Sequence, residues 1–265
     1  LIGSVAGGVL AQQTNLGVPY LVRAGLLGIN FLVALLLMKD LGFKPASGRN
    51  PAREIKKILK NSVKYGLRNP RMRWIMLASP FTGGITIYAF YAMQPYLLEL
   101  YGDKSAYGVA GLAAAIVAGA QIAGGLLVPY LGKLFRRRTS VLLVCEALSV
   151  VVLTAVGLVP NFWVVVVLLV LWGLMFAAVM PIRQAYLNAL IPSEQRATVL
   201  SFDSLFSSAG GVVFQPVLGK VADVWSYPAS YVVSAGIQAL SIPFTWLARR
   251  EKASADVIKA DAAGH

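Results

Sequence analysis

The most informative chemical group in this sequence is a carboxyl group, that of Asp203, inside the apolar segment 197–219. Ser207 follows it at helical spacing, so both side chains are expected on one face of a helix. A carboxyl group in such a segment can carry a proton when burial disfavours its charged form, or it can pair with a cation. Arg183 and Arg196 are the candidate partners. We favour an ion pair because Asp203 lies close to one end of the segment, and Asp203 and Arg183 are candidate coupling or gating residues.

Uncharged polar and aromatic side chains in the apolar segments are candidates for binding an organic molecule. Tyr and Gln donate and accept hydrogen bonds without carrying charge, which suits a cavity for an amphipathic compound. The candidate substrate-binding residues are Tyr88, Tyr91, Gln94, Gln121, Trp172, Ser207 and Gln215. For each of them the alternative is packing between neighbouring helices, and an aromatic and Met face such as that around Trp172 more often forms a core.

A basic cluster follows the segment 106–132. Gly132, Lys133, Arg136 and Arg137 belong to it. These residues can anchor one side of the protein at a membrane surface. They can also form a gate, in which cations meet carboxylates or helix C-termini in one conformational state and release them in the other. Both roles stay open.

No arrangement of residues predicts catalysis or a metal site. His265 is the only histidine and Cys145 the only cysteine, so there is no ligand cluster and no disulfide within the chain. No Ser/His/Asp set and no phosphate-binding loop of Walker type is present. We therefore expect no enzyme, no cofactor and no metal.

These residues must be positioned by long apolar segments. Hydrophobic residues make up 57% of the 265 residues and charged residues only 13%. Seven segments reach the roughly 20 residues that a helix needs to cross a bilayer. They are residues 16–38, 74–99, 106–132, 140–159, 161–182, 197–219 and 228–248. Because lipid cannot satisfy backbone polar groups, we predict an all-α, polytopic membrane helical bundle.

The basic residues lie almost entirely between spans that would share one side of the membrane. These are 39–73, 133–139, 183–196 and 249–265, which together carry 21 of the 24 Lys and Arg residues. Such an asymmetry predicts that this side, with the linker and the C-terminus, is cytoplasmic in a multi-pass cell-membrane protein. The net charge of +13 then indicates topology and contact with lipid headgroups. It does not predict nucleic-acid binding, because the charges flank membrane ends with little aromatic interleaving.

The segment 39–73 predicts an amphipathic helix. Asn50 can cap it, Pro51 can occupy its first position, and Gly66 with the following Asn69 and Pro70 can end it. Its apolar residues keep helical spacing, with lysines on the opposite face. We expect this helix to lie at the cytoplasmic interface. The alternative is a solvated basic linker.

Three local motifs, in this order, resemble those of one transporter family. Residues 3–8 are glycine-rich, with Ser4 where proline is usual in antiporters; residues 132–138 resemble the basic loop after the eighth span. Residues 191–201, followed by Gly219 and Asp223, are similar to the junction of spans ten and eleven. With its block of six spans behind a basic linker, the chain resembles the major facilitator superfamily, as spans five to twelve of a twelve-span protein.

The resemblance implies a fold and an activity. In this family two six-helix bundles enclose a central cavity and expose it to each side in turn. Residues 1–38 would be the last two spans of an N-terminally truncated first bundle, 39–73 a cytoplasmic linker, 74–248 the C-terminal bundle and 249–265 a cytoplasmic tail. The segments 74–99, 106–132, 161–182 and 197–219 would line the cavity, while 140–159 and 228–248 would pack outside it. Glu146 in 140–159 is therefore expected to make a hydrogen bond between helices.

The expected function is secondary active transport of a small molecule by alternating access. The glycine-rich residues 3–8 and a mostly uncharged cavity favour efflux of hydrophobic or amphipathic compounds, with protons as the candidate coupling ion. A fragment of eight spans is not expected to transport alone. The alternatives are a sugar or metabolite carrier, and a receptor or scaffold of the same fold that does not transport.

Overall fold

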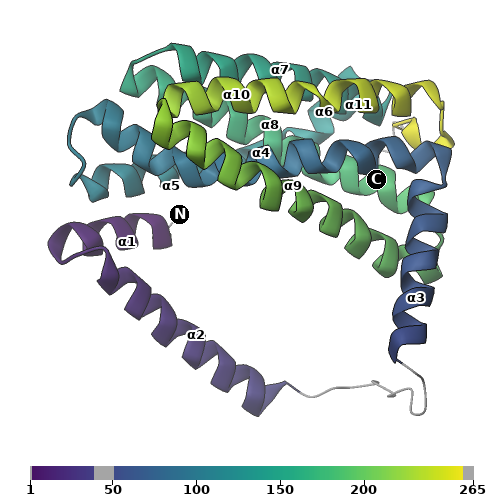
Figure 1. Cartoon of the computed structure of the whole chain (residues 1–265), viewed down its shortest axis with the longest axis horizontal. Coiled ribbons are helices and arrows are strands. Elements are labelled where there is room, and N and C mark those ends of the chain that lie inside the picture. Colours follow the sequence, from purple (N-terminus) through teal and green to yellow (C-terminus); the bar gives the residue numbers. More distant parts are fainter. Residues whose placement is uncertain (1, 39–50, 259–265) are drawn as a thin grey trace, which may run out of the picture.

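The computed structural model describes residues 2–38 and 51–258, and the chain is almost entirely helical there (Figure 1). The long helices are α1 (Ile2–Gln13), α2 (Gly17–Leu37), α3 (Pro51–Ser62), α4 (Pro70–Tyr101), α5 (Tyr107–Leu126), α6 (Val128–Leu134), α7 (Arg138–Leu158), α8 (Phe162–Leu190), α9 (Arg196–Val224), α10 (Tyr227–Ala239) and α11 (Ser241–Arg250). In this part of the chain 7 helical stretches are long and apolar enough to cross a membrane, which confirms the predicted helical bundle.

Several helices extend beyond the apolar segments that predict them. Helix α4 begins at Pro70, where the Asn69 side chain accepts a hydrogen bond from the backbone N–H of Arg71 at 3.1 Å. Helix α8 continues to Leu190, so Arg183 lies within a helix and not in the loop that the sequence predicts. The physical reason is that hydropathy marks where lipid ends, whereas helical hydrogen bonding continues for as long as the backbone groups find partners.

Two predicted spans are interrupted. The segment 106–132 divides into α5 and α6 at Leu127, and the last span divides into α10 and α11 at Leu240. Pro129 and Pro243 follow these breaks closely. Because proline has no N–H to donate to the preceding turn, it removes one helical hydrogen bond at each place.

The helices of the C-terminal bundle lie side by side along the long axis of the molecule (Figure 1). Helix α4 packs against α9 and α11, α8 packs against α5 and α7, and α7 packs against α10. Large buried side chains fill the space between them, including two tyrosines whose hydroxyl groups have partners. Tyr96 donates to the carbonyl oxygen of Val156 and Tyr231 to that of Ala89, both at 3.0 Å. Buried tyrosines of this kind join two helices through both packing and a hydrogen bond.

The crossing of α4 and α9 depends on glycine. A Cβ atom added to Gly210 would lie 2.6 Å from the carbonyl carbon of Pro80 in α4. A Cβ atom on Gly84 would lie 2.6 Å from the carbonyl carbon of Gly210. Real Cβ atoms do not approach this closely, so the two backbones touch only because these positions have no side chain. This crossing sets how α9 presents its polar residues toward α4.

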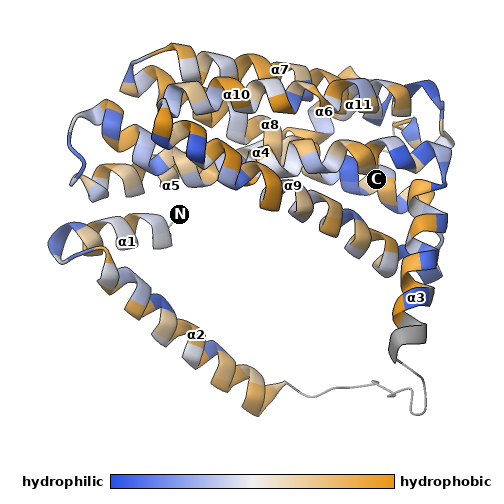
Figure 2. Cartoon of the chain, in the orientation of Figure 1, coloured by the Kyte–Doolittle hydropathy of each residue, from blue (hydrophilic) through white to orange (hydrophobic). Residues whose placement is uncertain are grey.

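The first two helices differ from the rest in their surroundings. Helix α1 packs against α5, where a Cβ atom on Gly111 would lie 3.0 Å from the Cα of Gly8. Helix α2 diverges from the bundle and has no buried residue (Figures 1 and 2). An apolar helix that is exposed along its length is stable only against lipid or against further protein.

The predicted helix in the linker is present as α3, which continues through a π-helical turn at Val63–Leu67. It runs across one end of the bundle, roughly perpendicular to the bundle helices (Figure 1). Ile55, Ile58 and Leu59 are exposed on it. Asn50, the predicted cap, lies outside the described residues. A helix that lies along a membrane surface would have this orientation relative to helices that cross the membrane.

Candidate functional site

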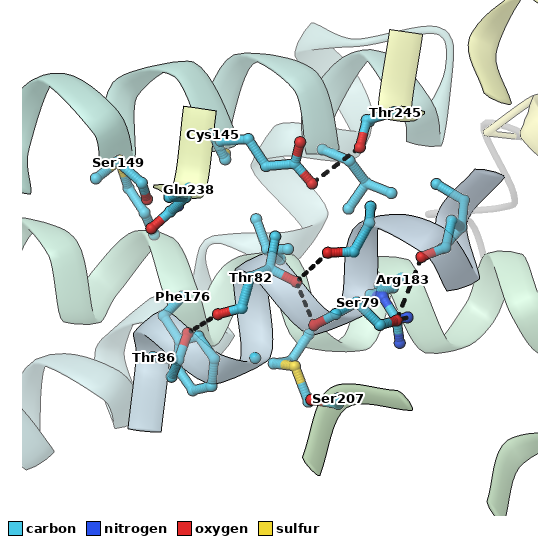
Figure 3. A pocket seen from close by; sticks show the side chains of 18 of the residues that line it. Ser79, Thr82, Thr86, Cys145, Ser149, Phe176, Arg183, Ser207, Gln238 and Thr245 are labelled. Atoms are coloured by element: carbon cyan, nitrogen blue, oxygen red, sulfur yellow. Dashed lines mark hydrogen bonds between the residues drawn. The ribbon is translucent and has the colours of Figure 1, made fainter. Parts of the chain in front are cut away.

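A cavity of about 350 Å³ lies within the C-terminal bundle (Figure 3). Residues from α4, α7, α8, α9, α10 and α11 line it, and two of them, Trp172 and Ser207, are predicted substrate-binding residues. None of its lining residues in the described part of the chain comes from α5. The expectation that 106–132 lines the cavity while 140–159 and 228–248 stay outside is therefore wrong for this cavity. The rotation of each helix about its own axis decides this, and hydropathy does not report it.

The lining is mainly apolar and hydroxyl-bearing. Trp172, Met175 and Phe176 form an apolar wall from α8. The threonine hydroxyl groups of α4 are largely engaged by their own helix, since Thr86 donates to the carbonyl oxygen of Thr82 at 2.8 Å. Such a surface can accommodate an apolar body with few free hydrogen-bonding groups. Its charged residues are Glu146, Arg183 and Asp203.

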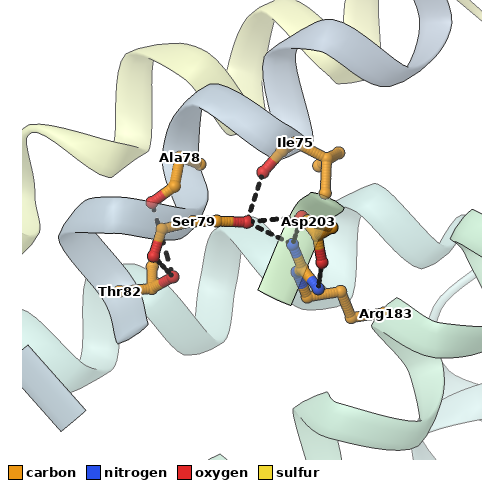
Figure 4. A network of polar contacts seen from close by, with 6 residues as sticks. All are labelled: Ile75, Ala78, Ser79, Thr82, Arg183 and Asp203. Carbon is orange, nitrogen blue, oxygen red and sulfur yellow. Dashed lines mark hydrogen bonds and ion pairs between the residues drawn. The ribbon is translucent and has the colours of Figure 1, made fainter. Parts of the chain in front are cut away.

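Arg183 and Asp203 form a two-pronged ion pair at the edge of this cavity (Figure 4). Arg183 donates from Nη1 to Oδ2 of Asp203 and from Nη2 to Oδ1, both at 2.8 Å. Ser79 of α4 completes the cluster by donating to Oδ1 of Asp203 at 2.8 Å and accepting from Nη2 of Arg183. The side chains are only 17% and 5% exposed. The cluster therefore joins three helices. Of the two candidate partners of Asp203, Arg183 is the one that pairs with it, whereas Arg196 donates to the carbonyl oxygen of Asn188.

Local sequence explains why these groups meet. Arg183 follows Pro181 in the last third of α8, and Ser79 precedes Pro80 in α4. Asp203 lies two turns before Gly210, the residue at which α9 touches α4. The close crossing at Gly210 thus brings Asp203 within hydrogen-bonding distance of Ser79. The two parallel hydrogen bonds of the pair and its contacts with Ser79 counteract the desolvation of both charges.

Glu146 of α7 is the second carboxyl group on the cavity, and the sequence reasoning assigned it no substrate role. Thr245 donates to its Oε1 at 3.0 Å and Ser241 to its Oε2 at 3.2 Å. The hydrogen bonds from α11 agree with the expected contact between helices. The sequence did not place Glu146 on the cavity, because the segment 140–159 was expected to lie outside it. The sequence feature that could have indicated this position is the presence of an acidic residue within a span.

The other predicted substrate-binding residues do not join this cavity. Tyr88, Tyr91 and Gln215 line a second, smaller hollow of about 250 Å³ that also includes Asp223. The Tyr88 hydroxyl group donates to Ser230 Oγ at 2.6 Å, so it is held between α4 and α10. Neither hollow includes Gln94, which is exposed, or Gln121, whose side chain lies near Gly173 of α8. The predicted set is thus divided because Tyr88 and Tyr91 lie farther along α4 than its residues that line the cavity, which end at Ile87.

The basic cluster is tied to the C-terminal segment by backbone contacts. The N–H of Ile258 donates to the carbonyl oxygen of Arg136 at 3.1 Å, and Arg137 forms a β-bridge with Val257. Lys133 lies 6.0 Å from the ring centre of Tyr130, and Gly132 faces Ile258. Among the described residues these side chains form no ion pair, so the structure is compatible with anchoring and leaves gating untested.

Asp256 fixes the C-terminal segment to the start of α7, and its substitution is expected to lower stability. Its carboxylate accepts hydrogen bonds from the N–H and the hydroxyl group of Thr139, both at 2.8 Å, and so caps the start of α7. Asp256→Ala is expected to lower the free energy of unfolding by about 1–2 kcal/mol, because the backbone N–H and the hydroxyl group of Thr139 lose their acceptor. The midpoint of thermal unfolding measures this. Asp256→Asn retains one acceptor oxygen and should lose less; equal losses in both variants would contradict the capping role.

Comparison with known proteins identifies the family. Residues 95–264, more than half of the chain, match the family model described as Major Facilitator Superfamily. The chain belongs to the major facilitator superfamily. Its recognition from the three motifs is confirmed. The helices described above are those of a multi-pass membrane protein in a family of transporters, and a lipid environment follows from that membership.

Relatives within this superfamily carry a common name. The chain is 26% identical over 259 residues to the multidrug resistance protein MdtG of Salmonella typhimurium, covering 95% of this chain and 61% of that protein. It is 27% identical to MdtG of Salmonella arizonae, with 96% and 62% covered. The chain thus spans less than two thirds of the length of these curated relatives. The chain also resembles the crystal structure of a bacterial homologue of the human lysosomal transporter Spinster, in an inward-facing and unoccupied conformation. The TM-score is 0.58 and the sequence identity 16%, and the match covers 96% of this chain and 66% of that one. At this identity the likeness supports the fold alone.

Proposed function

We propose that this chain provides the C-terminal six-helix bundle, the linker and two spans of the first bundle of a secondary transporter that exports amphipathic organic compounds across the cell membrane. Membership of a transporter family supports the general activity. The name of the MdtG relatives supports efflux as the direction and a broad substrate range. The basic end of the bundle, where α3, α6 and α11 gather, would face the cytoplasm.

The observation that carries the proposal is the cavity in the bundle. Its volume of about 350 Å³ lies at the lower end of ligand pockets, which measure about 300–1,000 Å³. Its apolar wall from α8 can receive an apolar body, and its few polar groups can orient it. A second bundle packed against α4 and α9 would enlarge this space and close it on one side at a time.

The energy source in the proposal is a proton gradient. Asp203 and Glu146 are the candidate proton carriers on the cavity, since both are acids within spans. Release of Asp203 from Arg183 in one state would give the carboxyl group access to solvent on one side. In the conformation described here, the pair is closed and Ser79 holds it.

A sugar or metabolite carrier is the second candidate, and the hydroxyl-bearing lining is the observation that favours it. Sugar recognition needs donors and acceptors that are free to face the ligand. Here the hydroxyl groups of Thr82 and Thr86 bond to carbonyl oxygens of their own helix. The lining therefore favours the amphipathic compound over the sugar.

Transport assays on the complete protein in proteoliposomes test the proposal. With the interior made acidic, uptake of a fluorescent amphipathic dye is expected to exceed uptake without a gradient, and radiolabelled glucose is expected to stay outside. Ser204→Leu should slow dye uptake because Ser204 lines the cavity. Ser201→Leu is the matched control, because Ser201 is exposed on the same helix but is not part of the lining. Ligand binding without uptake under any gradient would point to a receptor of the same fold and contradict the proposal.

A further inference from the structure

The charges on the cavity do not balance. Arg183 is neutralised by Asp203 through two hydrogen bonds, so this pair contributes no net charge. Glu146 has only the hydroxyl groups of Ser241 and Thr245 as partners. In the described ranges 2–38 and 51–258, no Lys, Arg or His forms an ion pair with Glu146 at 4.0 Å or less. With Glu146 ionised, the lining therefore carries one uncompensated negative charge.

The two hydroxyl groups hold the carboxyl group of Glu146 in place without neutralising it. Each oxygen receives one donor, at 3.0 and 3.2 Å, and both donors come from α11. Each carboxylate oxygen can accept a second bond, so acceptor capacity remains on the side that faces the cavity. A carboxylate out of water is stable only with a partner of opposite charge or with a proton. The carboxyl group is thus fixed in position and has room for a cation.

The apolar wall of the same cavity suits the remainder of such a ligand. The rings of Trp172 and Phe176 lie nearly parallel, 19° apart with centres separated by 6.1 Å, and Phe90 supports Trp172 from behind at 4.9 Å. Met175 adds a flexible thioether to this wall. Aromatic faces attract organic cations and also pack against apolar groups. Figure 3 shows Phe176 and Cys145, the neighbour of Glu146, on different sides of the cavity.

We propose that Glu146 is a cation-binding residue of the cavity and that its ligands are amphipathic organic monocations. The ammonium group of the ligand would meet the Glu146 carboxylate, and its apolar body would lie on Trp172, Phe176 and Met175. One positive charge brings the lining to neutrality, whereas an organic anion would add to the uncompensated charge. This inference rests on the proposed function, because it names the substrate class of the same cavity.

A matched pair of ligands tests it on the complete protein in detergent. The pair is a radiolabelled phenylbutyl-trimethylammonium ion and its neutral tert-butyl isostere, which differ in charge and hardly in shape. Equilibrium dialysis is expected to show tighter binding of the cation. Glu146→Gln should weaken the cation by about tenfold, because a charge-assisted contact is lost, and leave the isostere unchanged. Glu99→Gln is the matched control, since Glu99 is exposed at the far end of α4 and lies outside the cavity.

Further measurements keep the test decisive. Glu146→Asp retains the charge and should restore part of the preference for the cation. If Glu146→Gln does not fold, the native protein gives the answer through Cys145, which lines the same cavity. The cation should then slow maleimide labelling of the Cys145 peptide, read by mass spectrometry, more than the isostere does. Equal binding of both ligands, or equal protection of Cys145, overturns the inference while leaving proton-driven dye uptake intact. Loss of that uptake from the unmodified protein would instead overturn the proposed function.

Discussion

Asp203→Ala is expected to lower the free energy of unfolding by about 3–5 kcal/mol, the usual range when one partner of a buried ion pair is removed. The substitution leaves Arg183 charged inside the bundle, with its two 2.8 Å acceptors gone, and it deprives the Ser79 hydroxyl group of its nearer acceptor, which leaves the carbonyl oxygen of Ile75. Thermal unfolding in detergent and the yield of folded protein measure the effect. Asp223→Ala removes an acid from the far end of the same helix and should change stability far less.

The double variant Asp203→Ala with Arg183→Met separates the pair from its surroundings. Removing both charges leaves neither partner of this pair unpaired, so most of the lost stability should return. A double variant as unstable as Asp203→Ala would show that the loss comes from something other than the unpaired Arg183. Asp203→Asn distinguishes the two roles of the carboxyl group. Loss of proton-driven uptake at unchanged folded yield would assign proton coupling, and lowered yield alone would assign a structural anion.

Gly210→Val is expected to have the second large effect, by separating α4 from α9. A Cβ atom at this position already lies 2.6 Å from both the Cα and the carbonyl carbon of Pro80, and these are backbone atoms that cannot rotate away. Overpacking of this kind typically costs about 1–3 kcal/mol or more. The movement should also pull Asp203 away from Ser79, since both depend on this crossing.

The control for this prediction lies on the same helix. Gly219 has open space around its added Cβ atom, so Gly219→Ala should be neutral or slightly stabilising through helix propensity. Thermal unfolding of the two variants gives the comparison, and Gly210→Ala should fall between them. A Gly210→Val protein as stable as the Gly219→Ala protein would mean that the two helices can slide apart without loss.

Much of the fold could be predicted because a bilayer imposes a local rule. The number of spans, their helical state and the division of basic residues between loops depend on hydropathy and charge along the chain, and neither needs a partner helix. The amphipathic helix after residue 50 has the same origin, since helical spacing of apolar residues is also a local property. The three family motifs could also be recognised from the sequence, because each is a short, continuous run of residues.

The candidate site could be predicted only in part. The pairing of Asp203 with Arg183 was one of two options, and the choice depends on α8 continuing past Pro181 so that Arg183 faces α9. Trp172 and Ser207 share the main cavity, whereas Tyr88 and Gln215 face another hollow. Glu146 was recognised as an acid within a span, yet its place on the cavity was not. Each of these outcomes depends on how far a helix is rotated about its axis.

The sequence by itself determined the membrane-spanning plan and the distribution of basic residues, because solvation by lipid acts on each residue separately. It also determined the family, because the family motifs are short, continuous runs of residues. The tertiary structure decided which helices line the cavity, which cation meets Asp203 and that Glu146, the other carboxyl group on the cavity, forms no ion pair with a described residue. Those outcomes are set by contacts between residues far apart in the chain, such as Gly210 against Pro80 and Asp256 against Thr139. A rotation of about 100° per residue separates a side chain that faces the cavity from one that faces lipid, and only packing between helices fixes that angle.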